Sequence, residues 1–209
     1  MSRYTGPKCK LCRREGMKLF LKGARCETSA KCAIARRAHP PGEHPWTRKK
    51  RSEYGLQLRE KQKAKRIYGV YEKPFRNLFK TAAAMKGNTG ENLVQLLERR
   101  LDNVIYLAGF AHSRAHARQQ IVHGHIDVNG KRCKSPARRL RPGDTFRIAD
   151  REKSRKAAEV TLEYTKSRSI PAWLEVEASE FRGKVSELPK KEEASIDLQE
   201  QLIVEFCSK

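Results

Sequence analysis

The stretch SRAHARQQIVHGHIDVNGKRC, residues 113–133, joins a short helix signal to a hairpin signal and decides the fold. Ser113 is a residue type that caps the start of a helix, and Gly124 is the type that ends one. Asn129-Gly130 then stands between alternating residues, which is the strongest short-range signal for a β-hairpin. The stretch therefore predicts a helix followed directly by two antiparallel strands.

A second turn signal, Pro142-Gly143-Asp144, precedes a predicted strand over residues 145–148. The hairpin has to fold back on the helix to bury Ile121, Ile126 and Val128. Basic side chains of the helix, the hairpin and the segment before them then converge on one groove. These side chains are Arg99, Arg100, Arg114, Arg118, Lys131 and Arg132.

Three helices are predicted upstream of this stretch. Ser52 caps one from Glu53 to about residue 68, a second runs from near Pro74 to Gly87, and a third covers residues 89–100. On the first of these helices Arg59, Lys63 and Arg66 share a face, and like charges at that spacing repel one another. We expect nucleic-acid phosphate to supply the counter-charge; the alternative is a solvated helix.

Four cysteines near the N-terminus, Cys9, Cys12, Cys26 and Cys32, have the spacing C-x2-C-x13-C-x5-C. Thiolates at such spacing can close a tetrahedral site around Zn²⁺ and so hold a segment that is too short to form its own core. An iron–sulfur cluster uses the same ligand set. A disulfide framework is disfavoured because the start of the chain is polar and lacks an apolar export signal. Cys133 and Cys207 are expected to be ordinary buried residues.

The charge is large and uneven, with 46 Lys and Arg against 24 Asp and Glu and a formal net charge of +22. Residues 1–70 carry +15, residues 71–160 carry +10 and residues 161–209 carry −3. This gradient predicts a polyanion bound by the first three-quarters of the chain. No amphipathic basic helix points to a membrane surface, so nucleic acid is the favoured ligand. Aromatic residues make up 7%, which favours structured RNA over a stacked single strand.

Two other classes of protein share some of these features. An RNA-modifying enzyme needs a catalytic domain, and too little chain remains after residue 150 to form one. A zinc-dependent DNA-binding regulator needs a recognition helix for the major groove. Four histidines near the basic helix have no carboxylate partner at ligand spacing and are expected to face RNA or solvent. They are His112, His116, His123 and His125.

Several of these motifs resemble the RNA-binding domain named after ribosomal protein S-four: residues 100–103, 113–114, 117–119, 124–126, 128–130 and 142–144. RNA-modifying enzymes, tyrosyl-tRNA synthetases and a heat-shock RNA-binding protein contain a similar domain. The flanking segments decide among them. Residues 3–8, 13–16, 58–63, 75–78 and 200–206 resemble the bacterial small-subunit ribosomal protein S-four family, so the resemblance spans essentially the whole chain.

This resemblance implies a cytoplasmic ribosomal protein without catalytic activity or a small-molecule substrate. It implies primary binding to the 5′ domain of 16S rRNA, nucleation of 30S assembly, and contacts with ribosomal proteins S-five and S-three. The basic stretch Arg48, Lys49 and Arg51 matches the family's segment near the mRNA entry pore. The four cysteines resemble those of the metal-bearing branch of the family.

The predicted fold class is α+β: a mainly helical first domain with an N-terminal zinc knuckle, and an inserted domain of helix-turn-helix-like helices packed on a short sheet. We divide the chain into a Cys₄ knuckle and extension (1–45), a helical part (46–90), the RNA-binding domain (91–167) and a tail that closes the first domain (168–209). The predicted RNA-binding residues are Arg3, Tyr4, Lys8, Arg13, Arg14, Arg48, Lys49, Lys50, Arg51, Arg59, Lys61, Lys63, Arg66, Arg76, Arg99, Arg100, Ser113, Arg114, Arg118, Gln119, Lys131 and Arg132. The predicted turn residues are Gly124, Asn129, Gly130, Pro142, Gly143 and Asp144.

Two expectations follow for experiments. Replacing Arg114 and Arg118 is expected to weaken RNA binding while thermal stability barely moves. In the acidic tail, alternating apolar residues suggest strands that pack on the first domain, and these residues are Trp173, Leu174, Val176, Leu202, Val204 and Phe206.

Overall fold

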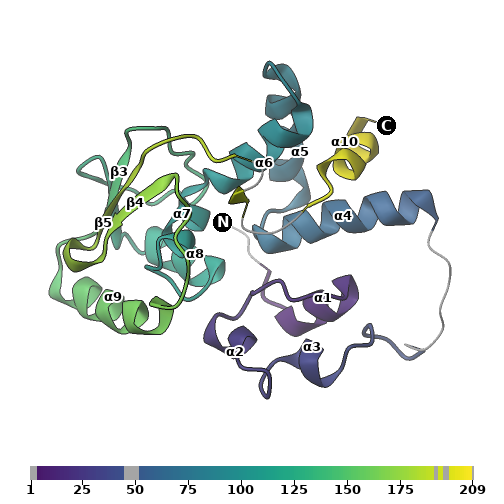
Figure 1. The fold of residues 1–209 in the computed structure, drawn as a ribbon, viewed down its shortest axis with the longest axis horizontal. Helices are drawn as coiled ribbons and strands as arrows, with labels where there is room; N and C mark the ends of the chain where they lie inside the picture. The colour runs from purple at the N-terminus through teal and green to yellow at the C-terminus, as the bar shows by residue number, and fades with distance from the viewer. Residues whose placement is uncertain (1–3, 45–51, 191–192, 195–197, 209) are drawn as a thin grey trace. The chain divides into compact units, whose positions relative to one another are not determined.

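The computed structural model describes residues 4–44, 52–190, 193–194 and 198–208 (Figure 1). The chain divides into two compact units. The first comprises Met1–Leu93 and Leu198–Lys209, and the second comprises Val94–Asp197. None of the helices among the described residues combines the length and the apolar character that crossing a membrane requires.

The first unit is helical. Its helices are α1 (Lys8–Glu15), α2 (Ala24–Glu27), α3 (Ala33–Arg36), α4 (Glu53–Ile67), α5 (Glu72–Ala84), the start of α6 (Thr89–Glu98) and α10 (Glu200–Ser208). The Oγ of Ser52 accepts a hydrogen bond from the N–H of Gly55 at 3.2 Å, which confirms the predicted cap of α4. Phe75 and Ala82 of α5 are fully buried, as their spacing predicts.

Helix α10 packs along α4 (Figure 1). The rings of Tyr54 and Phe206 lie 5.3 Å apart, and the side-chain amide of Gln57 donates to Glu205 Oε2 at 2.9 Å. The expectation of a strand through Leu202, Val204 and Phe206 is therefore wrong. A short run of alternating apolar residues also fits the face of a helix, and contact with α4 selects the helix.

The second unit combines helices with an antiparallel sheet. Its elements are the end of α6, α7 (Leu101–Leu107), α8 (Arg114–Val122), β1 (Ile126–Val128), β2 (Lys131–Arg132), β3 (Thr145–Ile148), α9 (Glu152–Thr165), β4 (Leu174–Glu177), η1 (Ala178–Glu180) and β5 (Arg182–Val185). The five strands lie in the order β2-β1-β3-β5-β4. Every neighbouring pair is antiparallel, so the mixed helical and sheet class is confirmed.

The core of this unit lies between α7, α8 and the sheet. Buried side chains at helical spacing on α7 and α8 meet alternate residues of β1 and β3, and these residues are Leu101, Val104, Ile105, Ala117, Ile121, Ile126, Val128, Phe146 and Ile148. The rings of Phe110 and Phe146 meet edge to face, with centroids 6.2 Å apart. Burying a side chain of this size contributes about 1.5–3 kcal/mol, so this cluster holds α8 against the hairpin.

The tail differs from the expectation that all of residues 168–209 close the first domain. Strands β4 and β5 belong to the second unit, where β5 pairs with β3 and places Phe146 opposite Gly183. The free edge of β3 explains this path, since β1 covers only its other edge and unpaired backbone groups need partners. Only Leu198 and the residues after it join the first unit.

Candidate nucleic-acid interface

Helix α8 has the predicted start and end. The N–H of His116 donates to Ser113 Oγ at 3.3 Å, which caps the helix. Gly124 follows the helix with a φ of +75°, a conformation that glycine adopts without steric cost. Gln119 on this helix and His123 directly after it are exposed, so they are available to a ligand.

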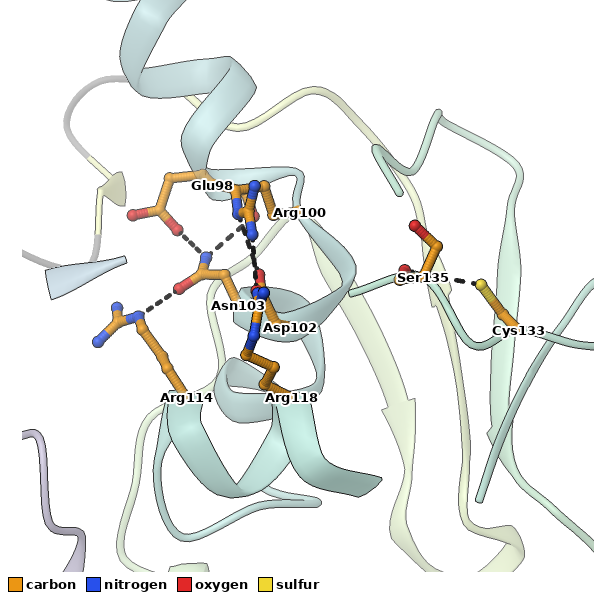
Figure 2. Close-up of polar contacts among 8 residues, drawn as sticks. All are labelled: Glu98, Arg100, Asp102, Asn103, Arg114, Arg118, Cys133 and Ser135. Atoms are coloured by element: carbon orange, nitrogen blue, oxygen red, sulfur yellow. Dashed lines mark hydrogen bonds and ion pairs between the residues drawn. The ribbon is translucent and has the colours of Figure 1, made fainter. Parts of the chain in front are cut away.

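A buried polar network joins α7 to the start of α8 (Figure 2). Arg100 makes a bidentate contact with Asp102, with Nη2–Oδ2 at 2.7 Å and Nε–Oδ1 at 3.1 Å. The side-chain amide of Asn103 donates to Glu98 Oε2 at 2.5 Å and accepts from Arg114 Nε at 2.7 Å. Figure 2 shows Asn103 between Glu98 and Arg114.

Two of the predicted RNA-binding arginines are thus engaged inside the protein. Arg100 is 4% exposed and Arg114 is 8% exposed, and the guanidinium of Arg114 also lies 4.5 Å from the ring centroid of Tyr106. A change at Arg114 would leave buried groups without partners, so the structure predicts a loss of stability, in contrast to the expectation that stability barely moves. Contact between either arginine and RNA stays a prediction.

Arg118 lies closer to solvent than Arg100 and Arg114. Its side chain is 20% exposed, and its Nη1 is 3.4 Å from Asp102 Oδ2. Asp102 therefore contacts two guanidinium groups, that of Arg100, which is buried, and that of Arg118, which is partly open to solvent. The partly open group can approach a phosphate while it keeps its link to Asp102.

The predicted turns lie together at one end of the sheet. Asn129 and Gly130 have φ values of +51° and +74°, as a type I′ hairpin turn requires. The side-chain amide of Asn129 donates to Asp144 Oδ1 at 2.8 Å, and the N–H of Thr145 donates to Asn129 Oδ1 at 2.8 Å. The hairpin and the Pro142-Gly143-Asp144 turn are thereby fixed to each other.

The hairpin also brings basic side chains to the end of α8. A Cβ added at Gly124 would lie 2.9 Å from Arg132 Cδ and 3.6 Å from Lys134 Cε, so these two side chains cross the glycine directly. Lys131 and Arg132 are both exposed. The predicted convergence of the helix with the hairpin is therefore present at this point.

A basic loop, residues 134–141, was not among the predicted sites. Its exposed basic residues are Lys134, Arg138, Arg139 and Arg141. Backbone bonds fix the loop to the start of α7, since the N–H of Leu101 donates to Arg138 O at 2.8 Å and that of Asp102 donates to Pro136 O at 3.2 Å. The run of four basic residues in eight positions was a visible signal, but the sequence did not indicate that the loop lies beside α7 and α8.

Arg99 connects this loop with the predicted site. Its Nε donates to Leu140 O at 2.7 Å. Burial lowers the pKa of Arg99, and the positive charges of Arg139 and Arg141 lower it further. These three cations repel one another, and an anion bound among them would relieve that repulsion.

In the first unit, protein carboxylates supply the counter-charge that we expected from RNA. Glu15 of α1, with a side chain 3% exposed, pairs with both Arg59 (2.9 Å) and Arg66 of α4. Lys63 pairs with Glu60 at 2.6 Å. The repulsion on this face of α4 is therefore already balanced within the fold.

A similar cluster surrounds Glu72 at the start of α5. Lys61 and Lys65 of α4 contact its carboxylate at 2.5 and 2.7 Å, and Arg76 contacts it at 3.0 Å. Burial raises the pKa of Glu72, but the hydrogen bonds from these three cations outweigh burial and lower it to about 2. Lys61 is 4% exposed and lies over the Phe206 ring, so its side chain is a structural contact.

The remaining predicted contacts of the first unit lie near its N-terminus. Arg13 Nε donates to His39 O at 3.0 Å and Arg14 Nη2 donates to Pro41 O at 2.9 Å, so both hold the segment that follows α3. Tyr4 is 45% exposed and Lys8 is half-buried. The predicted sites Arg3, Arg48, Lys49, Lys50 and Arg51 lie outside the described residues.

The four histidines near α8 form two stacked pairs. The ring centroids of His112 and His116 lie 5.3 Å apart, and those of His123 and His125 lie 6.2 Å apart. Burial lowers the pKa of His116, and His112 lowers it further. Burial also lowers the pKa of His125, as do His123 and Arg151. The lowered pKa values favour the neutral form of both rings.

The N-terminal cysteines have the donor chemistry of a metal site. Cys12, Cys26 and Cys32 are buried, and the N–H of Lys22 donates to Cys26 Sγ at 3.3 Å. Burial raises the pKa of Cys12; in Cys32, backbone N–H groups of Ala35 and Ile34 outweigh burial and lower the thiol pKa. Among the residues that the structure describes, no group of three or more His, Cys, Asp or Glu side chains is placed so as to hold a metal ion. The four thiols are suitable ligands for Zn²⁺, but their positions in the described residues do not form a complete metal site.

Comparison with known proteins covers both units. A family model described as "Ribosomal protein S4/S9 N-terminal domain" matches residues 3–98, and one described as "S4 domain" matches residues 99–146. The chain is 56% identical over 209 residues to "Small ribosomal subunit protein uS4" of Thermodesulfovibrio yellowstonii, with 100% of both chains covered. Proteins of the same name from Citrifermentans bemidjiense (56% over 211 residues) and Thermoanaerobacter pseudethanolicus (54% over 209 residues) are likewise covered over 100% of both chains.

Proposed function

The chain belongs to the family of the small ribosomal subunit protein uS4, and we propose that it binds ribosomal RNA through the surface formed by α8, the β1–β2 hairpin and the basic loop 134–141. As a member of this family it is a structural component of the ribosome and not an enzyme. The residues before the RNA-binding domain match a ribosomal N-terminal domain, which disfavours the RNA-modifying enzyme, the heat-shock protein and the DNA-binding regulator.

One observation carries the RNA-binding proposal. The exposed Arg132 of the hairpin and the exposed Lys134 of the basic loop cross Gly124 at the end of α8. The buried arginines nearby are engaged within the protein, because Arg100 pairs with Asp102 and Arg114 donates to the neutral amide of Asn103. Structured RNA is recognised largely through its phosphates and its shape, and separated exposed cations suit that mode of binding. The surface residues that we assign to RNA are Arg118, Gln119, Lys131, Arg132, Lys134, Arg138, Arg139 and Arg141.

The finer role follows from the family. We propose that the RNA is the 5′ domain of 16S rRNA and that binding nucleates assembly of the 30S subunit. Arg48, Lys49, Lys50 and Arg51 are proposed to lie near the mRNA entry pore, next to ribosomal protein S-three. The acidic tail is proposed to contact ribosomal protein S-five and to influence translational accuracy, because its net charge of −3 is repelled by phosphate.

We also propose that Cys9, Cys12, Cys26 and Cys32 hold one Zn²⁺, with an iron–sulfur cluster as the alternative. The burial of three of these thiols and the backbone N–H groups directed at Cys26 and Cys32 support the proposal. A bound metal would fix α1, α2 and α3 to one another, since a small segment of this kind lacks a large apolar core.

The test compares two double variants, each of which lacks two exposed cations. Arg138→Ala/Arg139→Ala removes two charges of the basic loop, whose backbone contacts to α7 do not depend on those side chains. We expect on the order of tenfold weaker binding to a 5′-domain fragment of 16S rRNA, with a log–log salt slope reduced by about one unit per lost phosphate contact. The control is Lys153→Ala/Lys156→Ala, which removes the same charge from α9. Equal losses in the two variants would contradict the assigned surface.

A further inference from the structure

We propose that α9 is a brace for α8: with the adjoining Arg168 it holds the segments at both ends of the RNA-binding helix and thereby sets RNA affinity through residues that contact only protein. This inference rests on the proposed function. Residues 152–168 lie beyond the segment matched by the "S4 domain" model, which ends at residue 146. The brace therefore extends the RNA-recognition unit past that segment.

The buried face of α9 consists of small and hydroxyl-bearing side chains, namely Ser154, Ala158, Thr161 and Thr165. Their spacing of three or four residues places them on one side of the helix. Each is at most 5% exposed. Three of the four have a hydroxyl group, so α9 makes directional contacts in addition to the apolar packing of Ala158.

These contacts reach the two ends of α8. At the far end, Ser154 Oγ lies 2.9 Å from Nδ1 of His125, just after the helix. At the start, Thr165 Oγ1 donates to Gly109 O at 2.8 Å in the turn that leads into the helix. Thr161 Oγ1 lies 3.5 Å from Nε2 of His112 in the same turn.

Arg168, just beyond α9, completes the contact with the turn. Its Nη1 donates to Ala111 O at 3.3 Å and its Nη2 donates to His112 O at 3.1 Å. Both carbonyls directly precede Ser113, the residue that caps α8. The guanidinium also lies 4.9 Å from the ring centroid of Tyr106, which lies 4.5 Å from the guanidinium of Arg114. One tyrosine ring thus links α7, the start of α8 and the end of the brace.

A helix of nine residues depends on such contacts, because an isolated helix of that length is not stable in water. RNA binding requires Arg118 and Gln119 to keep a fixed spacing from the hairpin cations. Holding both ends of α8 before RNA arrives removes an ordering cost from binding, which is how preorganisation raises affinity. Arg168 and Thr165 are therefore positioning residues for the interface.

The experiment uses two matched pairs of variants of the full chain. Arg168→Ala removes the carbonyl contacts together with one charge, and Lys166→Ala removes one exposed charge from the same segment as the control. Thr165→Val removes the hydroxyl at nearly constant volume, and Thr165→Ser retains it as the rescue. Trp173 fluorescence during urea unfolding, measured in a Trp46→Phe background, checks that each variant is folded, since Trp173 is buried in the second unit.

We expect Arg168→Ala and Thr165→Val to weaken binding to the 5′-domain fragment by roughly three- to tenfold, with an unchanged salt slope because no phosphate contact is lost. Without RNA, amide hydrogen exchange of residues 110–116 should be faster in both variants. Lys166→Ala and Thr165→Ser should match the wild type. Equal affinities of Arg168→Ala and Lys166→Ala would overturn the brace.

Two further outcomes distinguish a brace from a direct contact between Arg168 and RNA and from a failure of RNA binding itself. Weaker binding with unchanged exchange in the RNA-free protein would overturn the brace, because that result indicates that Arg168 touches RNA. Failure of the wild-type protein to bind the fragment would contradict the proposed function. In that event unchanged exchange in Arg168→Ala and Thr165→Val would overturn the brace as well, because exchange is measured without RNA.

Discussion

At the scale of single residues, burial separates two kinds of arginine that look alike in the sequence. Arg114 and Arg118 stand one turn apart on α8 and were assigned the same role. In the structure Arg114 is buried against Asn103, whereas Arg118 is partly open. Both arginines contact α7, but Arg114 lies against Asn103 and Tyr106 whereas Arg118 reaches only the outer side of Asp102 at 3.4 Å, and a local pattern does not contain these contacts.

The first prediction is that Arg114→Ala destabilises the second unit by about 1.5–3 kcal/mol, the cost of a buried hydrogen bond to a charged group. The variant leaves Asn103 Oδ1 without its donor at 2.7 Å and Tyr106 without one of its cations. Urea unfolding monitored by Trp173 fluorescence in a Trp46→Phe background measures the change in unfolding free energy.

Arg118→Ala is the matched control, because it removes the same side chain from the same helix. Its contact with Asp102 is longer, at 3.4 Å, and lies nearer to solvent. Its effect on the unfolding free energy should stay below about 1 kcal/mol. If Arg114→Ala were as mild as Arg118→Ala, the buried network would not have the structural role assigned to it.

At the scale of elements, local signals predicted those parts of the fold that depend on local chemistry. Ser113, Gly124 and the Asn129-Gly130 turn specify their own backbone geometry, and the structure has the helix and the hairpin where they indicate. Helix α9 was not predicted as an element. Its buried face of Ser154, Ala158, Thr161 and Thr165 lacks the apolar stripe that usually reveals a helix.

Tertiary contacts decided the elements of the tail in the same way. Apolar and polar residues alternate in β4, and their burial in the structure follows that pattern. Nothing in the local sequence indicates that β5 pairs with β3. The basic face of α4 suggested RNA because the balancing Glu15 lies on another helix and distant in sequence. Partners that are remote in the chain are therefore the common reason why the sequence did not indicate these contacts.

The second prediction concerns the link between α4 and α5. The folded-state pKa of Glu72, about 2, is below its unfolded value, which is about 4.3. A lowered pKa stabilises the fold above the unfolded value, and the contribution is lost as the pH falls from about 4.3 towards about 2. The difference in unfolding free energy between the wild type and Glu72→Gln should therefore be largest near neutral pH and shrink over that acidic range.

Because the Glu72 side chain is 40% exposed, solvent screening should keep the difference at neutral pH near or below about 1 kcal/mol. Urea unfolding followed by far-UV circular dichroism at several pH values measures it. Glu152→Gln is the control. Glu152 also pairs with a lysine, Lys156, but its side chain is 80% exposed. A pH-independent difference for Glu72→Gln would show that its three cations do not stabilise the folded carboxylate.

At the scale of the whole molecule, the chain leaves the first unit near Leu93 and returns to it at Leu198. The charge changes along the chain, since the strongly basic segments come first and residues 161–209, with a net charge of −3, come last. Within the first unit α10 gives α4 an apolar partner together with polar contacts such as Gln57 to Glu205. The first unit thus has structural support from α10 that does not involve its N-terminal cysteines.

The third prediction separates these two sources of support. Freshly purified protein should contain one metal ion per chain, and a chelator should speed amide exchange in α1, α2 and α3 while exchange in the second unit stays unchanged. Elemental analysis with hydrogen exchange measures both effects. Acid should release the metal, because protons compete with it for the thiolates.

Two cysteine variants make this test specific. Cys26→Ser should abolish metal binding, whereas Cys133→Ser should retain it, because Cys133 is buried in the core of the second unit and its thiol donates to Ser135 O at 3.7 Å. Cys26 and Cys133 are similarly buried. The two variants therefore differ in whether the lost thiol belongs to the N-terminal group of four cysteines. A metal content of zero in the wild type, or equal loss in the two variants, would rule out the Cys₄ site; α1–α3 would then depend on contacts such as Glu15 with Arg59 and Arg66.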